Sequence, residues 1–132
     1  MILPPLPWPP SVNAMWRTPR TGPLAGRTLL SEEGRKYRHA VRAAVGQRKA
    51  LHGRLRVSIE VRMPDKRRRD LDNLPKAILD SLTHAGVWCD DSQIDDLRVW
   101  RSDRMGGCIL VTVDELAAAQ AELPVESEEV AF

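Results

Sequence analysis

The most regular pattern in the chain is a strict alternation of apolar and polar residues over 54–63, RLRVSIEVRM. A period of two predicts a strand with one buried and one polar face, and Pro64 is expected to end it. Residues 96–102 and 108–113 have shorter strand-like patterns, and the segment 103–107 between them contains two adjacent glycines that suit a turn. The residues of the first strand that are expected to face the core are Leu55, Val57, Ile59, Val61 and Met63.

Apolar residues at helical spacing predict two helices, over 31–48 and 74–85. Ser31 is the expected N-cap of the first helix, because two glutamates follow it in the first turn. For the second helix, Asn73 is the expected N-cap and Gly86 the residue that ends it. The apolar stripe of this second helix consists of Leu74, Ala77, Ile78 and Leu82.

The outer face of the first predicted helix is basic. Its members are Arg35, Lys36, Arg38, His39 and Arg42. A charged helix face is most often simply solvated, but it also suits contact with phosphate groups. The sequence leaves both interpretations open.

The two ends of the chain differ in composition from its middle. Residues 3–10, LPPLPWPP, are too rich in proline for a helix and predict an edge segment of a sheet, although such runs also serve as linkers or SH3-type ligands. Residues 14–30 predict a long loop, and residues 117–132 an acidic tail. Together the elements predict a single α+β domain over residues 1–116, with a mixed sheet of about four strands packed against two main helices.

Composition narrows the class of protein. The chain has 132 residues, of which 42% are hydrophobic and 29% charged, and this is typical of one globular domain. No apolar run approaches the ~18 residues of a membrane span, and the first ten residues lack the basic start of a signal peptide. Cys89 and Cys108 have no CxxC spacing, which argues against a zinc ribbon or a disulfide framework. We expect a cytoplasmic protein without a membrane partner or a small-molecule cofactor.

The net charge of +2 hides an asymmetry along the chain. Residues 114–132 contain six acidic residues and no Lys or Arg, so the preceding residues hold all 20 basic residues against 12 acidic ones, a balance of +8. Sixteen of the basic residues are Arg, whose guanidinium binds phosphate in a forked geometry. A basic body of this kind indicates a polyanionic partner.

The segment between the first strand and the second helix, DKRRRDLDNLPK at 65–76, concentrates candidate chemistry. Asp70 and Asp72 are two residues apart and would project to the same side of an extended chain. Lys76 follows in the first turn of the helix. A second acidic cluster comes after that helix and consists of Asp90, Asp91, Asp95 and Asp96. Oxygen ligands on loops beside an arginine cluster suit Mg²⁺ that also contacts phosphate.

Ordinary structural roles also account for these residues. An Asp-rich loop is commonly a set of turns and helix caps, and the run Arg67–Arg69 can be solvated. Lys76 and Asp80 have the i,i+4 spacing of a surface ion pair. The remaining candidates have no metal-ligand spacing or catalytic arrangement: we expect the three histidines to be structural or on the surface, the two cysteines to be in the core, and Trp88 and Trp100 to be in the core or an interface.

The order of these motifs resembles the RusA family of Holliday junction resolvases, which occur in bacteria and their phages. The resemblance covers roughly residues 6–116 and is densest over 63–77, MPDKRRRDLDNLPKA. The motifs outside that block are LPWPPS at 6–11 with Asn13, Ser31-x-x-Gly34-x-x-Tyr37-Arg38, Asp80-x-Leu82-x-x-Ala85-Gly86-Val87-Trp88, Asp90-Asp91 and Gly106-Gly107. The segment 14–28 aligns poorly, and the acidic tail lies outside the resemblance.

The resemblance implies a homodimeric, Mg²⁺-dependent endonuclease that nicks four-way DNA junctions symmetrically in recombination and repair, with Mn²⁺ as a substitute metal. It implies catalytic and metal-binding roles for Asp70, Asp72 and Asp91, a catalytic role for Lys76 and a metal-binding role for Asp90. A phage or prophage origin would also fit. The expected DNA contacts are Arg67, Arg68, Arg69, Lys76, Asn73 and Asn13. A two-fold dimer with two active sites would match the approximate two-fold symmetry of the junction.

Two other functions stay open at the level of sequence. The first is a metal-dependent nuclease that is less selective among branched DNA structures. The second is a non-enzymatic basic DNA-binding protein whose acidic residues only cap turns and helices. Convergence of Asp70, Asp72 and Asp91 in space would favour an enzyme, since capping does not bring such distant residues together.

Overall fold

A computed structural model describes residues 1–117, so the tail predicted at 117–132 lies outside the described residues except for Ala117. A four-stranded sheet has the order β1-β6-β4-β5, and its strands run Leu6–Pro7 (β1), Leu55–Met63 (β4), Ile94–Met105 (β5) and Cys108–Glu115 (β6). β4 pairs parallel with β5 and antiparallel with β6. The predicted α+β class with a mixed four-stranded sheet is therefore confirmed.

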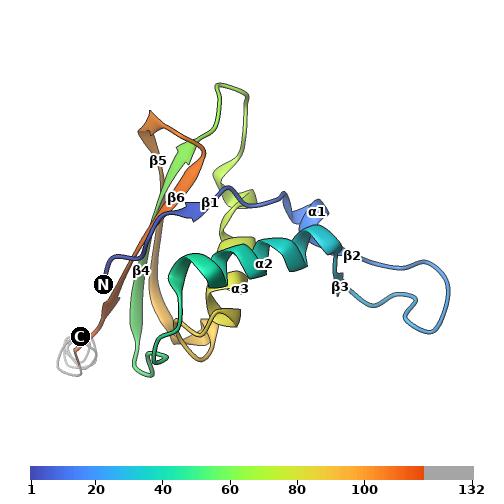
Figure 1. Cartoon of the computed structure of the whole chain (residues 1–132), viewed down its shortest axis with the longest axis horizontal. Helices are drawn as coiled ribbons and strands as arrows, with labels where there is room; N and C mark the ends of the chain where they lie inside the picture. The colour runs from blue at the N-terminus through green and yellow to red at the C-terminus, as the bar shows by residue number, and fades with distance from the viewer. Residues whose placement is uncertain (118–132) are drawn as a thin grey trace, which may run out of the picture.

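Strand β4 is the centre of the sheet and follows the predicted alternation. The core-facing residues Leu55, Val57, Ile59 and Val61 are fully buried, whereas the intervening polar residues are half-buried on the opposite face. Figure 1 shows the helices on one side of the sheet, where they cover the apolar face of β4. The pattern of the sequence thus determines which face of the sheet holds the core.

Two helices form most of the layer that covers the sheet, α2 (Glu32–Val45) and α3 (Pro75–His84). The Ser31 hydroxyl accepts a hydrogen bond from the Gly34 amide, which confirms Ser31 as the N-cap of α2. The apolar stripe predicted for α3 is buried as expected. Gly86, at φ 84°, follows the end of α3 in the left-handed conformation that glycine adopts readily.

The connection from β4 to β5 determines where the candidate chemistry lies. Adjacent parallel strands need a crossover, and here the crossover contains a 3₁₀ turn at Leu71–Asn73 (η1), helix α3 and a second 3₁₀ turn at Asp91–Gln93 (η2). Asn73 was predicted to cap α3, but it ends the η1 turn, and Leu74 takes the N-cap position without a side-chain hydrogen bond. The prediction for Asn73 was therefore wrong.

The segment 14–30 is more ordered than the predicted loop. A short helix, α1 (Val12–Met15), leads into the antiparallel pair β2 (Trp16–Arg17) and β3 (Leu29–Leu30). The Ser31 hydroxyl donates to the carbonyls of Ala14 and Met15, so the capping residue of α2 also fixes the end of α1. Only local turns separate β2 from β3 over 18–28.

The proline-rich start forms the predicted sheet edge, because β1 pairs with β6 and the Leu3 amide donates to the Val111 carbonyl over 3.0 Å. The Tyr37 hydroxyl ties this edge to α2 by donating to the Pro7 carbonyl over 2.8 Å. β5 extends beyond the predicted 96–102 at both ends.

The expectations for four single residues have mixed outcomes. Trp88 is buried, as expected for a core residue, whereas Trp100 is 45% exposed and does not belong to the core. Cys89 is exposed and Cys108 half-buried, so the core positions expected for them were wrong. Among residues 1–117, no helix is both long enough and apolar enough to cross a membrane.

We expect Gly34→Ala to lower the free energy of unfolding by about 1–3 kcal/mol, the usual cost of overpacking. A Cβ at this position would lie 2.4 Å from the Met15 carbonyl oxygen and 2.8 Å from a Leu30 methyl carbon. Gly53→Ala is the matched control, because a Cβ there meets nothing within 4 Å and the backbone φ is not positive. Urea unfolding of both variants measures the difference; equal stability would contradict close packing at Gly34.

Candidate functional site

The arginine-rich loop between β4 and η1 is held in place by an ion pair within the loop. Both terminal nitrogens of Arg69 donate to the Asp65 carboxylate, and the Arg67 amide donates to it over 2.9 Å. The Arg69 side chain, and then the Arg67 amide, lower the pKa of Asp65 to about 2. The Arg101 side chain donates to the Arg69 carbonyl over 2.6 Å, which ties the loop to β5. The loop therefore has a defined shape before any ligand binds.

A cleft of about 390 Å³ opens beside this loop. It is lined by Trp8, Pro9, Ser11, Arg68, Arg69, Asp70, Asn73 and Leu74. The Arg69 guanidinium lies 5.7 Å from the centre of the Trp8 ring, within the range of a cation–π contact. Four of the residues predicted from the sequence thus meet at one cleft, where an aromatic side chain and two arginines lie together.

Asp70 and Asp72 are both exposed, and no other side chain or amide in residues 1–117 binds either carboxylate. Asp70 has an extended backbone, but residues 71–73 form the η1 turn, so the extended geometry expected to align the two carboxylates was wrong. Both residues precede the N-terminus of α3, where the helix dipole favours negative charge. Several other aspartates of the chain bind arginine, which sets this pair apart.

Lys76 lies in the first turn of α3, exposed and without a carboxylate partner in the described part of the chain. Its ammonium group lies 4.6 Å from the centre of the Trp16 ring. The alternative pairing with Asp80 was wrong, because Asp80 binds the guanidinium of Arg38 through two hydrogen bonds of 2.9 and 3.0 Å. No carboxylate of the described residues neutralises Lys76, so its ammonium group is available to an anionic ligand.

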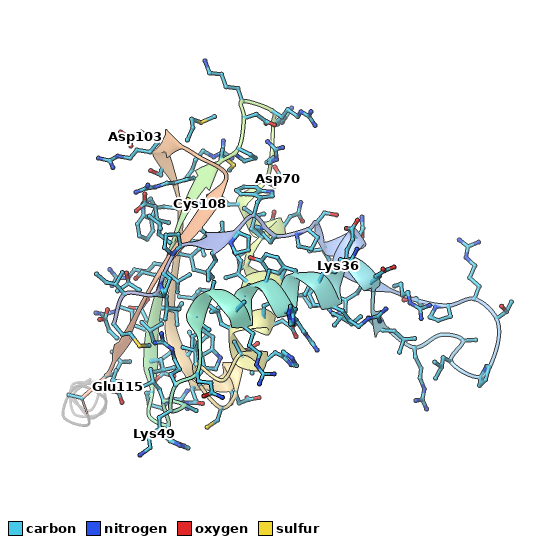
Figure 2. All side chains as sticks on the ribbon, viewed as in Figure 1. Lys36, Lys49, Asp70, Asp103, Cys108 and Glu115 are labelled. Atoms are coloured by element: carbon cyan, nitrogen blue, oxygen red, sulfur yellow. The ribbon has the colours of Figure 1, made fainter. Side chains whose placement is uncertain are left out.

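Asp91 lies at the opposite end of α3. The Thr83 hydroxyl, in the last turn of the helix, donates to the Asp91 carboxylate, and the Trp88 indole N–H lies 3.3 Å from the same oxygen. A ten-residue helix is about 15 Å long, and it separates Asp91 from the Asp70–Asp72 end. Figure 2 shows Asp70 at the upper end of α3, and the gold segment that leads into β5 lies at the lower end in Figure 1.

The other acids of the second cluster have local partners. Asp90 caps η2 by accepting from the Ser92 amide over 2.9 Å, and hydrogen bonds from Ser92 lower its pKa. Asp95 and Asp96 bind Arg54 and Arg56. The expectation that Asp70, Asp72 and Asp91 converge is not met within one chain: no group of three or more His, Cys, Asp or Glu in residues 1–117 could hold a metal ion.

The residues present nevertheless suit Mg²⁺ in one respect. This ion is usually held by one or two carboxylates and completes its shell with water and substrate phosphate. The unpaired oxygens of Asp70 and Asp72 meet the first requirement, and the neighbouring Arg68, Arg69 and Lys76 would attract the phosphate. Asp90 and Asp91 do not add to this pair within the same chain.

Sequence reasoning missed several residues of the site. Trp8 and Trp16 contact Arg69 and Lys76, while Asp65 and Arg101 hold the loop. The LPWPP run was the only available signal for Trp8, and no local pattern links Trp16 to a lysine sixty residues later. Asn13 is exposed on α1 but does not line the cleft, so a DNA contact there stays a prediction.

Comparison with known proteins gives one consistent result. The family model described as endodeoxyribonuclease RusA matches residues 7–114. Over 115 residues the chain is 44% identical to the crossover junction endodeoxyribonuclease of Enterobacteria phage HK97, an alignment that covers 84% of this chain and 92% of that protein. The proteins of the same name from Escherichia coli K12 and Shigella sonnei match with the same identity and coverage.

The Asp65–Arg69 pair predicts a pH dependence of the loop. Because the folded-state pKa is depressed, the pair should stabilise the loop above pH ~4, the ordinary range for Asp, and lose its effect as pH falls through about 2. In Arg69→Ala the pKa of Asp65 should rise toward its ordinary value, while Lys66→Ala, which removes a neighbouring positive charge, should leave it low. Carboxyl ¹³C NMR titration measures both; an ordinary pKa in the wild type would contradict the pairing.

Proposed function

Because the chain belongs to the RusA family of endodeoxyribonucleases, we propose that it is a Mg²⁺-dependent endonuclease that resolves four-way DNA junctions by paired, symmetric nicks. The observation that carries this proposal is that neither Asp70 nor Asp72 binds a partner within the described residues. Asp70 lines a cleft that also contains two arginines, Asp72 follows it in η1, and Lys76 lies in the first turn of α3. Negative metal ligands beside positive phosphate ligands suit metal-assisted hydrolysis of a phosphodiester.

Each residue of the site has a distinct part in this function. Asp70 and Asp72 would hold the metal, which when bound activates a water and neutralises charge on the phosphate. Lys76 places a positive charge where the phosphate gains negative charge. Arg69, fixed by Asp65, and the exposed Arg68 draw the DNA backbone into the cleft against the repulsion of the two carboxylates.

The structure argues against the non-enzymatic alternative at Asp70 and Asp72. Helix caps bind backbone amides through their side chains, as Asp90 does at η2. Asp70 occupies the N-cap position of η1 without a side-chain hydrogen bond, and the Asp72 carboxylate binds no backbone amide in the part of the chain that the structure describes. Capping therefore does not account for these two carboxylates, and both are free to bind a cation.

A second copy of the chain would resolve the separation of Asp91 from the other acids. β5 is an edge strand of the sheet and carries exposed Leu97 and Trp100, and the unpaired backbone groups of a long edge strand can pair with another strand. Two-fold antiparallel pairing of β5 would set the two α3 helices antiparallel on the same side of one extended sheet. The Asp91 end of one α3 would then face the Asp70–Asp72 end of the other, so the dimer would complete each metal site.

Charge at the metal gives the main test of the reaction. Asp70→Asn keeps the size of the side chain but removes a negative charge, so we expect nicking of four-way junctions to fall at least a hundredfold, the scale of ~2.7 kcal/mol, while binding stays equal or becomes tighter. Asp72→Asn and Asp91→Asn should behave alike, and Lys76→Ala should lose cleavage with a smaller effect on metal affinity. Gel-shift and nicking assays with Mg²⁺, run on the same samples, measure both effects. The control is Asp95→Asn, at an aspartate whose carboxylate binds Arg54.

Rapid cleavage by Asp70→Asn would remove this residue from the mechanism. Wild-type protein should be assayed side by side on four-way junction, fork and duplex DNA. Equal cleavage of forks and junctions would favour the less selective branched-DNA nuclease over a junction resolvase.

The proposed interface predicts that Leu97→Lys with Trp100→Lys yields a monomer of 14.8 kDa. The new charges would repel across the two-fold axis and remain solvated on a free edge. Leu24→Lys, at an exposed hydrophobic residue of the 18–28 loop, is the control and should remain dimeric. Sedimentation velocity measures the state; a wild-type monomer that makes paired nicks at nanomolar concentration would contradict the dimer.

A further inference from the structure

A second concave surface lies between the outer faces of α2 and α3, away from the Trp8 cleft. This groove has a volume of about 320 Å³ and is lined by Leu30, Arg35, Arg38, His39, Arg42 and His84. Figure 1 shows α2 passing across α3, so that side chains from both helices can border one groove. Its polar lining consists of three arginines and two histidines.

The charges of the groove are only partly neutralised. Arg38 is bound by Asp80, whose carboxylate reaches across from α3. Arg35 donates to the Leu30 carbonyl over 3.2 Å, and Arg42 has no side-chain partner within residues 1–117. A merely solvated face gains nothing from bringing like charges together in a concave surface, whereas an anionic ligand gains from all of them. The groove therefore favours the phosphate-binding interpretation of the α2 face.

The groove and the proposed active site both border α3, at different points along the helix. Lys76, Asp80 and His84 are spaced i, i+4 and i+8, so they lie along one face of the helix. Eight residues of helix span about 12 Å. At the Lys76 end, the Trp16 ring that contacts Lys76 belongs to β2, which pairs with the strand containing Leu30. A strand whose phosphate lies at Lys76 can therefore continue into the groove.

We propose that this groove binds backbone phosphates of the DNA strand held at Lys76, about three or four nucleotides from the scissile phosphate, given a rise of about 3.4 Å per nucleotide in one strand. The inference rests on the proposed function for the position of that phosphate. The contacts are to phosphate and not to bases, so they add affinity and register without adding base preference. Arg35 and Arg42 supply the free charge, and the Arg38–Asp80 pair holds the two helices together around the groove.

The first test compares two double variants with the same change in charge. Arg35→Ala with Arg42→Ala empties the groove of its free arginines. Arg56→Ala with Arg62→Ala removes two arginines of β4 from the face of the sheet opposite the helices. Without metal, the groove variant should bind junction DNA about tenfold more weakly at 0.1 M salt, and its log–log salt slope should fall by about two. The control variant should keep the wild-type slope.

The second test locates the contact on the DNA. Junctions with a single neutral methylphosphonate at successive positions should bind wild-type protein more weakly when the third or fourth phosphate from the cleavage site is neutral. In the groove variant, neutralising the same phosphates should have no further effect. Arg42→Ala alone provides the same comparison if the double variant unfolds at lower urea concentration, since the Arg42 side chain has no partner within the described residues.

An unchanged salt slope in the groove variant, or the same methylphosphonate pattern as wild type, would overturn the inference. Both tests measure binding without metal and require no cleavage. A wild-type protein that binds through the groove but does not nick junctions in Mg²⁺ would therefore overturn the proposed function alone. A cleaving enzyme whose groove variant binds like wild type would overturn the groove alone.

Discussion

The parallel pairing of β4 with β5 is the constraint on which the arrangement of the site depends. Two adjacent parallel strands begin at the same end of the sheet, so the chain that leaves β4 must return along the whole length of the sheet before β5 can start. Helix α3 makes that return. Asp70 and Asp72, which come after β4 and before α3, are thereby placed at one end, and Asp91, which precedes β5, at the other.

This constraint also explains the limits of the sequence analysis. The alternation over β4, the stripe of α3 and the cap at Ser31 are local patterns, and each was predictable because local burial or a single hydrogen bond determines it. The direction of pairing between β4 and β5 is not local. The acids were expected to converge on grounds of residue type and family resemblance, but a parallel pairing separates them within one chain. In the proposed dimer their convergence would require a second molecule, which a single sequence does not describe.

The prediction of a loop in the N-terminal region was wrong for a related reason. Residues 14–30 have the composition of a loop, yet α1, β2 and β3 form there because the Ser31 side chain and the tight approach of Gly34 to the Met15 carbonyl fix the chain from outside the segment. The prediction of Asn73 as a helix cap was wrong because Asn73 is the last residue of the η1 turn, so α3 starts one residue later than expected. In both cases a tertiary or neighbouring contact outweighed an intrinsic preference.

The four tryptophans lie in four different environments of the molecule. Trp8 borders the cleft, Trp16 lies beneath Lys76, Trp88 is in the core, and Trp100 is on the outer strand of the sheet. Indole emission depends on the polarity and quenching groups around each ring. Chains that retain one tryptophan at a time would therefore give separate optical signals for ligand arrival, loss of the core and contact at the sheet edge, all without an attached dye.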